Sequence, residues 1–390
     1  MRWKDAAEMR LAVIRQTYNP YGGAERFVER ALNALRDAGE PIDITLVARR
    51  WQGEVAPGVT LLRRNPFKLG RLSRDFGFAW SVQGLIRQKR FDLVQSHERI
   101  PGCDIFRAGD GLHCTWLELR SRTLSPVERF LQACSPWHRY TCRAEAAMLR
   151  DPRLRAVICN SQMVRNDIAT RFPAITDKLH VIHNGVDLER FQPALREQHR
   201  AQVRTGLGVT EQTPVALYVG SGFSRKGVPQ LLAAMARPEL HNAELWVVGK
   251  DKESAALQRQ AQEQGLRVRF LGPQKDVTPW LGAADVFVLP TLYDPMPNAA
   301  LEALASGLPV LCSNTCGAAE LIRPGINGDV VDALDVAGIT AALLGLLVAM
   351  QDPAAAERMR QAARHSVSSL GREAMAQALL DLYRQLLQKT

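Results

Sequence analysis

The most informative part of the sequence is Tyr218-Val-Gly-Ser-Gly-Phe-Ser-Arg-Lys-Gly-Val228, where a predicted strand runs into a glycine-spaced loop and then directly into a helix. Glycines let backbone N–H groups approach an anion, and the helix N-terminus adds partial positive charge. Arg225 and Lys226 place two formal charges where a diphosphate would lie. The spacing fits neither a Walker A loop nor a G-x-G-x-x-G fingerprint. The alternative is a solvated turn with two surface cations.

Outward from this stretch, short apolar runs alternate with longer helical segments. Strands are predicted at residues 10–16, 42–48, 93–96, 156–160, 180–183, 214–220, 243–249, 267–272, 284–290 and 309–313. Helices are predicted at residues 24–38 and 372–387. This alternation favours parallel sheets covered by helices on both faces. We expect a first domain over 1–190, a second over 191–370, and a last helix over 371–390 that packs back toward the first domain; the polar, turn-rich stretch 187–213 lies at the boundary.

A second informative stretch runs from Pro290 to Glu302, where a strand ends, a proline-rich loop follows, and a helix begins near Asn298, a good N-cap residue. Asp294 and Glu302 can both face the carboxyl-terminal edge of a parallel sheet, where ligands bind in open α/β folds. Carboxylates suit sugar and ribose hydroxyls because they accept several hydrogen bonds. The alternative is an ordinary acid before a helix and a surface glutamate.

Together, these two stretches resemble the C-terminal half of family 4 glycosyltransferases, which are retaining enzymes with nucleotide-sugar donors. Asp294 stands where glutamate is usual in that family. The stretch Asn19-Pro-Tyr-Gly-Gly-Ala-Glu25 is similar to the family's glycine-rich first loop, and residues 101–110 are similar to a segment of its lipopolysaccharide core glucosyltransferases. The resemblance implies an α/β protein of the GT-B fold, with two Rossmann-like parallel-sheet domains facing a central cleft.

The resemblance also implies roles for individual residues. The donor would be held by Gly22, Gly23, Gly222, Arg225, Lys226, Asn298, Ala299, Ala300 and Glu302. Asp294 would bind hydroxyls of the transferred sugar, and His97 and Asp110 would position the acceptor hydroxyl. The implied mechanism is front-face displacement, in which the leaving UDP phosphate takes the acceptor proton and the protein supplies orientation and charge stabilisation. The chain has no Asp-x-Asp sequence, so we expect no metal and no cofactor beyond the nucleotide-sugar donor.

The charge of the chain points to an anionic partner, because 50 Lys and Arg outnumber 40 Asp and Glu. Residues 61–90 carry eight basic side chains against one acid, and residues 115–150 again mix arginines with aromatics. The aromatics of the first stretch are Phe67, Phe76, Phe78 and Trp80. This mixture predicts a membrane surface and a phosphorylated glycolipid as partners. The alternative is a solvated basic face with its aromatics in the core. No recognition motif supports nucleic acid.

Seven cysteines without a C-x-x-C pair predict reduced thiols, and the chain shows neither a secretory signal nor an apolar run of about 18 residues. We therefore predict a cytoplasmic protein, peripheral on the inner face of the membrane. The resemblance implies transfer of a hexose from a UDP-sugar to the heptose region of lipopolysaccharide core or a related glycolipid. Two alternatives are a non-catalytic protein that binds anionic glycolipid and a GT-B nucleotide-sugar epimerase.

Overall fold

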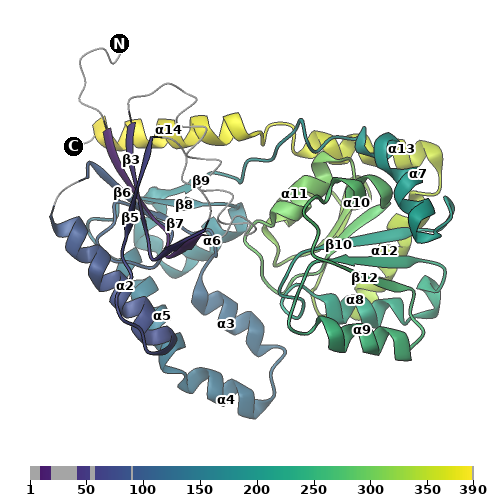
Figure 1. Cartoon of the computed structure of the whole chain (residues 1–390), viewed down its shortest axis with the longest axis horizontal. Helices are drawn as coiled ribbons and strands as arrows, with labels where there is room; N and C mark the ends of the chain where they lie inside the picture. Colours follow the sequence, from purple (N-terminus) through teal and green to yellow (C-terminus); the bar gives the residue numbers. More distant parts are fainter. Residues whose placement is uncertain (1–8, 19–41, 53–57, 89–90, 389–390) are drawn as a thin grey trace. The chain divides into compact units, whose positions relative to one another are not determined.

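The computed structural model describes residues 9–18, 42–52, 58–88 and 91–388. The chain divides into two compact units (Figure 1). The first unit comprises Met1–Gly185 and Arg372–Thr390, and the second comprises Val186–Gly371. Each unit is built on one main parallel sheet and is described by itself.

The first unit has a seven-stranded sheet in the order β5-β3-β1-β6-β7-β8-β9, in which every pairing is parallel. Its strands are β1 (Met9–Ile14), β3 (Ile42–Ala48), β5 (Val59–Arg63), β6 (Leu93–Ser96), β7 (Ile105–Arg107), β8 (Ala156–Cys159) and β9 (Leu179–Val181), with a small separate pair formed by β2 (Thr17–Tyr18) and β4 (Arg50–Trp51). Its helices are α2 (Gly70–Arg87), α3 (His113–Ser121), α4 (Pro126–Cys134), α5 (Pro136–Leu149), α6 (Gln162–Arg171) and α14 (Arg372–Gln388), with a 3-10 helix at Pro173–Lys178.

The two faces of this sheet are covered by segments from opposite ends of the chain. Alternate residues of a strand point to opposite faces. In β1, Ala12 and Ile14 pack with α2, α5 and α6, whereas Leu11 and Val13 pack with α14. Figure 1 shows α14 running along the side of the sheet away from α2 and α5. The Tyr383 hydroxyl of α14 also donates a 2.7 Å hydrogen bond to Gln95 Oε1 in β6, so the last helix is part of the first unit.

The second unit has a six-stranded parallel sheet in the order β12-β11-β10-β13-β14-β15. Its strands are β10 (Val215–Val219), β11 (Glu244–Val248), β12 (Val268–Gly272), β13 (Val286–Leu289), β14 (Val310–Ser313) and β15 (Gly328–Val331). Its helices are α7 (Leu195–Leu207), α8 (Val228–Met235), α9 (Ser254–Glu263), α10 (Thr278–Ala283), α11 (Asn298–Ala305), α12 (Val336–Ala349) and α13 (Pro353–Ser366), with 3-10 helices at Pro238–Leu240 and Gly317–Leu321. One hydrophobic core fills both faces of the sheet.

Several predicted elements differ in the structure. The stretch 187–213 is not simply a polar connection, because α7 occupies much of it and packs against α10. The first residue of α11 is Asn298, and the residue at the N-cap position is Pro297. The predicted helix over 24–38 lies outside the described residues. No helix in the described part of the chain is by itself long and apolar enough to cross a membrane; α12 and α13 pass that test only as a pair bent by 113°.

Candidate active site

The loop after β10 is held in shape by two glycines with positive φ. Gly222 has φ +77° and Gly227 has φ +84°, a region that L side chains disfavour. At Gly227 a side chain would also meet the end of β13, because a Cβ atom there would lie 2.1 Å from the Pro290 carbonyl oxygen. The loop therefore passes against the end of the neighbouring strand before α8 begins.

An acid that the sequence analysis did not single out holds the front of this loop. The N–H groups of Gly222 and Phe223 both donate to Asp251 Oδ2, at 2.9 Å and 3.3 Å. Asp251 follows β11, so it reaches the loop from an adjacent strand. These two amides are therefore occupied by a carboxylate, and the next charged side chains of the loop are those of Arg225 and Lys226.

Those side chains meet the second informative stretch of the sequence. Lys226 Nζ lies 3.0 Å from Asp294 Oδ2, and Arg225 Nη1 lies 3.6 Å from the same oxygen. The Arg225 guanidinium also donates to the Tyr293 carbonyl at 2.6 Å, and the Leu292 N–H donates to the Arg225 carbonyl at 2.8 Å. The structure thus brings two adjacent cations together with an acid that follows them by 68 or more residues in the chain.

The start of α11 lies just beyond this cluster, four residues after Asp294. Asn298 and Ala299 are its first residues, and the Ala300 N–H turns back to the Pro297 carbonyl at 3.1 Å. Glu302, one turn further on, is only 3% exposed. A buried carboxylate is costly unless it is hydrogen-bonded. Glu302 is therefore not the surface glutamate of the alternative interpretation.

A buried tyrosine hydroxyl lies beside the same loop. Tyr218 is fully buried in β10, and its hydroxyl has no hydrogen-bond partner in the described part of the chain. A Cβ atom placed on Gly220 would lie 3.3 Å from that hydroxyl and 3.3 Å from Lys226 Cδ, so both side chains flank the glycine. Burial raises the pKa of the Tyr218 phenol, which keeps it protonated. A protonated, unpaired hydroxyl at this position can donate to an anion.

In the first unit, His97 follows β6 and is 6% exposed. Its Nε2 lies 3.1 Å from Gln95 Nε2, while Gln95 Oε1 accepts the Tyr383 hydroxyl. The amide NH₂ therefore donates to the ring, so the imidazole is neutral and carries its proton on Nδ1. Burial, together with the nearby Arg107 and Arg15, holds the pKa of His97 well below its usual value. His97 is therefore buried, oriented by Gln95 and uncharged.

Asp110 follows β7, and its side chain is 56% exposed. Arg15 Nη1 lies 3.7 Å from Asp110 Oδ2 and 3.6 Å from Glu98 Oε1. Arg15 and Arg107 are functional candidates that the sequence analysis missed. Arg15 lay hidden inside a predicted strand, and Arg107 is a buried arginine whose pKa is lowered by burial to about 9. Arg15 and Arg107 thus lie near both His97 and Asp110.

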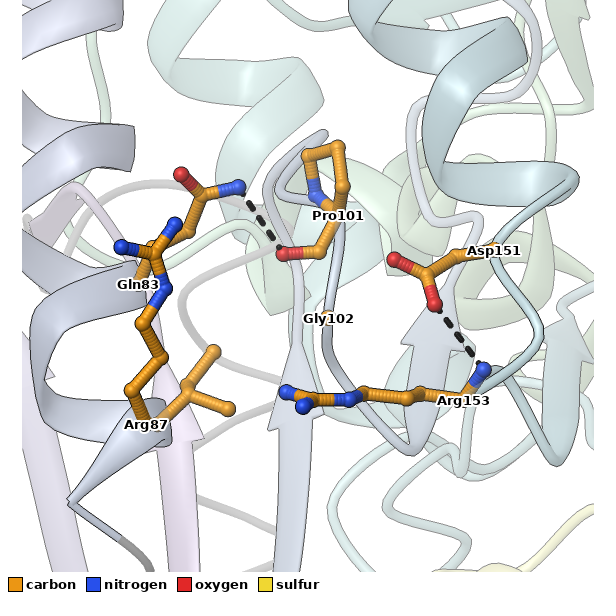
Figure 2. A pocket seen from close by; sticks show the side chains of 7 residues that line it. Gln83, Arg87, Pro101, Gly102, Asp151 and Arg153 are labelled. Carbon is orange, nitrogen blue, oxygen red and sulfur yellow. Dashed lines mark hydrogen bonds between the residues drawn. The ribbon is translucent and has the colours of Figure 1, made fainter.

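The first half of the 101–110 segment has a structural role. Pro101 and Gly102 line a pocket of about 240 Å³ together with Arg87 and Arg153. Figure 2 shows how these residues lie. The Gln83 amide donates to the Pro101 carbonyl at 3.2 Å, which ties this turn to α2. Gly102 has φ +93°, a conformation that explains the glycine. Only the far end of the segment, at Asp110, reaches the carboxyl-terminal edge of the sheet.

The remaining predicted residues divide between described and undescribed parts of the chain. Gly22 and Gly23 lie outside the described residues. Of the four aromatics in the stretch 61–90, only Phe78 is buried, whereas Phe67, Phe76 and Trp80 are 58% or more exposed. The alternative interpretation, with these aromatics in the core, therefore holds for Phe78 alone.

Comparison with known proteins identifies the family. Residues 21–190 match the family model Glycosyltransferase Family 4, and residues 213–349 match the model Glycosyl transferases group 1. The chain is 31% identical over 375 residues to the D-inositol 3-phosphate glycosyltransferase of Streptomyces avermitilis, a match that covers 87% of this chain and 77% of that protein. The chain belongs to glycosyltransferase family 4. This family 4 glycosyltransferase is thus an enzyme, which favours sugar transfer over the binding-protein and epimerase alternatives.

Similarity to other members of the family extends over most of the enzyme. It is 26% identical over 322 residues to the lipopolysaccharide glucosyltransferase WaaG of Escherichia coli, over 80% of this chain and 83% of WaaG. A crystal structure of WaaG superposes with a TM-score of 0.79 at 22% identity, covering 95% of this chain and 99% of that one. HepE of Anabaena in complex with UDP-glucose gives 0.69 at 19%, covering 97% and 100%. These likenesses confirm the predicted GT-B fold for this glycosyltransferase.

Proposed function

We propose that this enzyme moves a hexose from a UDP-sugar to the heptose region of lipopolysaccharide core, or to a related glycolipid, with retention at the anomeric carbon. The observation that carries the proposal is the meeting of Arg225, Lys226 and Asp294 at the end of β10. The name of WaaG supports the acceptor, and the complex of HepE with UDP-glucose supports the donor.

In this proposal, Arg225 and Lys226 stabilise the charge that develops on the diphosphate as the sugar leaves. The bond from the anomeric carbon to the phosphate oxygen breaks, and a bond to the acceptor oxygen forms on the same face. The acceptor proton passes to the leaving phosphate oxygen. No enzymic nucleophile and no metal ion are required, because the two cations supply the positive charge and the loop supplies the orientation.

Asp294 makes a specific demand on the donor. Its carboxylate is paired with Lys226 at 3.0 Å, so a phosphate has to compete with Asp294 for this ammonium group. When the phosphate takes Lys226, the Asp294 carboxylate becomes available to sugar hydroxyls. Asp294 thereby opposes the binding of UDP alone and favours UDP that carries a sugar.

The acceptor side of the proposal rests on exposed apolar residues among basic ones. No residue of α4 is buried, and Phe130 and Leu131 on this helix are 68% and 62% exposed. On α2, Phe76 and Trp80 are 58% and 69% exposed, and Arg71 lies on the same helix. Apolar side chains with nearby cations bind anionic lipid surfaces. We therefore propose that the enzyme works as a peripheral protein on the inner face of the cytoplasmic membrane.

Isothermal titration calorimetry without metal tests the donor site. UDP, UDP-glucose, UDP-galactose and UDP-N-acetylglucosamine are titrated into the wild type and three variants. We expect UDP and one UDP-sugar to bind, Lys226→Ala to lose both, and Asp294→Asn to bind UDP more tightly while losing the preference for the sugar. Arg259→Ala, at an exposed position on α9, serves as the matched control. Equal affinities in Lys226→Ala and Arg259→Ala would refute the assignment.

A further inference from the structure

A charged cavity lies in the second unit, at the end of the sheet opposite the loop after β10. It has a volume of about 550 Å³ and is lined where β10 and β13 begin, whereas the loop follows the end of β10. Helices α7 and α13 supply arginines to it, and the apolar side chains are Leu347 of α12 and Met350, the residue that caps the end of this helix. The proposed donor site uses none of these residues.

The floor of this cavity is a fully used ionic cluster around Asp285. Its Oδ1 atom accepts Arg200 Nη1 at 2.9 Å, and its Oδ2 atom accepts Arg204 Nη2 at 2.7 Å and the Val215 N–H at 2.9 Å. Arg200 is also bonded to Glu211, the other acid of the cavity. Both oxygens of Asp285 are therefore taken at hydrogen-bond distance by groups other than the remaining arginines.

Those remaining arginines, Arg196 and Arg360, line the cavity with only long contacts. Arg196 lies 3.6 Å from Asp285 and 3.8 Å from Glu211, and Arg360 lies 3.9 Å from Glu357. A charge-assisted hydrogen bond is about 2.7–2.9 Å long. Yet the two side chains are only 28% and 19% exposed. They are cations withdrawn from water without a close counter-ion in the described part of the chain.

The charges of this cluster favour an anion. Four arginines face three acids, of which Asp285 is buried, whereas the side chains of Glu211 and Glu357 are 58% and 59% exposed. Burial, with Arg200 and Arg360 nearby, lowers the pKa of Arg196 to about 10. A phosphate monoester carries a charge of about −1.5 to −2 near neutral pH, so it can pair with both remaining arginines.

We propose that this cavity binds a small phosphate-bearing organic molecule, with its phosphate between Arg196 and Arg360 and its apolar part against Leu347 and Met350. Guanidinium groups bind phosphate oxygens through paired hydrogen bonds, which the long ion-pair contacts leave available. The site would let a metabolite bind to the second unit without occupying the proposed donor site at the loop after β10.

Phenyl phosphate and inorganic phosphate are the probes, titrated into the full chain by calorimetry. We expect phenyl phosphate to bind more tightly than inorganic phosphate, and Arg196→Gln and Arg360→Gln each to weaken it by about tenfold or more, as for hydrogen bonds to charged groups. Arg358→Gln, at an exposed position on α13, is the matched control and should bind as the wild type does. Lys226→Ala should also leave the affinity unchanged.

Three results would overturn the proposal. The first is no saturable binding of phenyl phosphate. The second is an unchanged affinity in both Arg196→Gln and Arg360→Gln. The third is a loss of affinity in Lys226→Ala alone, which would place the phosphate at the donor loop. Equal affinity for the two probes would refute the role of Leu347 and Met350. Circular dichroism of each variant ensures that a loss of binding is not a loss of fold.

Discussion

Replacement of Gly227 by alanine tests the geometry on which the donor site depends. The residue has φ +84°, and this conformation costs a non-glycine residue about 1–2 kcal/mol. The added Cβ atom would also lie 2.1 Å from the Pro290 carbonyl oxygen and 2.8 Å from Pro290 Cγ, so the loop or the end of β13 has to move. Overpacking of this kind destabilises the folded state by a further 1–3 kcal/mol, roughly as it does in protein cores.

Gly208→Ala is the matched control, because Gly208 has φ +65° and a Cβ atom there meets nothing within 4 Å. Both variants are destabilised by a side chain at a residue with positive φ, but only in Gly227→Ala does the added Cβ atom also clash with Pro290. In a unit of this size about 1 kcal/mol corresponds to roughly 2–4 °C, so the melting temperature of Gly227→Ala should lie roughly 2–12 °C below that of Gly208→Ala. Differential scanning calorimetry measures both. Gly227→Ala should also lose UDP binding. Equal melting temperatures would refute the tight approach of the loop to β13.

Three further predictions concern other parts of the molecule. Asp285→Asn should cost about 3–5 kcal/mol of unfolding free energy, because it removes the carboxylate charge that faces the buried Arg204, whereas Asp381→Asn, at a side chain that is 61% exposed, should cost less than about 1 kcal/mol; urea unfolding measures both. Because the pKa of His97 is lowered in the folded protein, only the unfolded chain takes up a proton at this imidazole below about pH 6.5. The protein should therefore lose stability as the pH decreases, and His97→Gln should lose it less steeply; an unchanged slope of melting temperature against pH would contradict this. Phe130→Ser should reduce sedimentation with anionic phospholipid vesicles without lowering the melting temperature, and undiminished binding would argue against α4 as a membrane contact.

The parts of the fold that the sequence predicts are those with the strongest apolar patterns. Strands β8 and β13 are buried along their whole length, and such runs of apolar residues are recognisable without any partner. Strand β5 was missed because it lies at the edge of its sheet and is only partly buried. Strand β7 was also missed, because it has only three residues and the last of them is the buried Arg107.

Helix α7 shows a different limit of sequence analysis. Its residues Arg200 and Arg204 face inward, because Asp285 and backbone carbonyls satisfy them there. A pattern based on hydrophobicity reads such arginines as solvated, so the stretch seemed a polar connection. Buried charges of this kind are determined by residues some 80 positions away, which periodicity does not reveal.

The candidate site also contains residues that the sequence predicts and residues that it does not. Arg225, Lys226 and Asp294 could be predicted because the loop and the helix start have recognisable local patterns. Asp251 and Tyr218 were not, because their importance depends on contacts made across the sheet. A carboxylate that binds the loop amides, and a buried hydroxyl without a partner, have no signature in the linear sequence.

A transfer assay measures the proposed reaction itself. The enzyme is incubated with lipopolysaccharide that ends at the inner-core heptose and with each radiolabelled UDP-sugar in turn, and the anomeric configuration of the product is read from its proton coupling constant. We expect label in the lipopolysaccharide from one UDP-sugar, with the configuration of the donor retained, and no label with Lys226→Ala. A product of inverted configuration, or full transfer by Lys226→Ala, would contradict it.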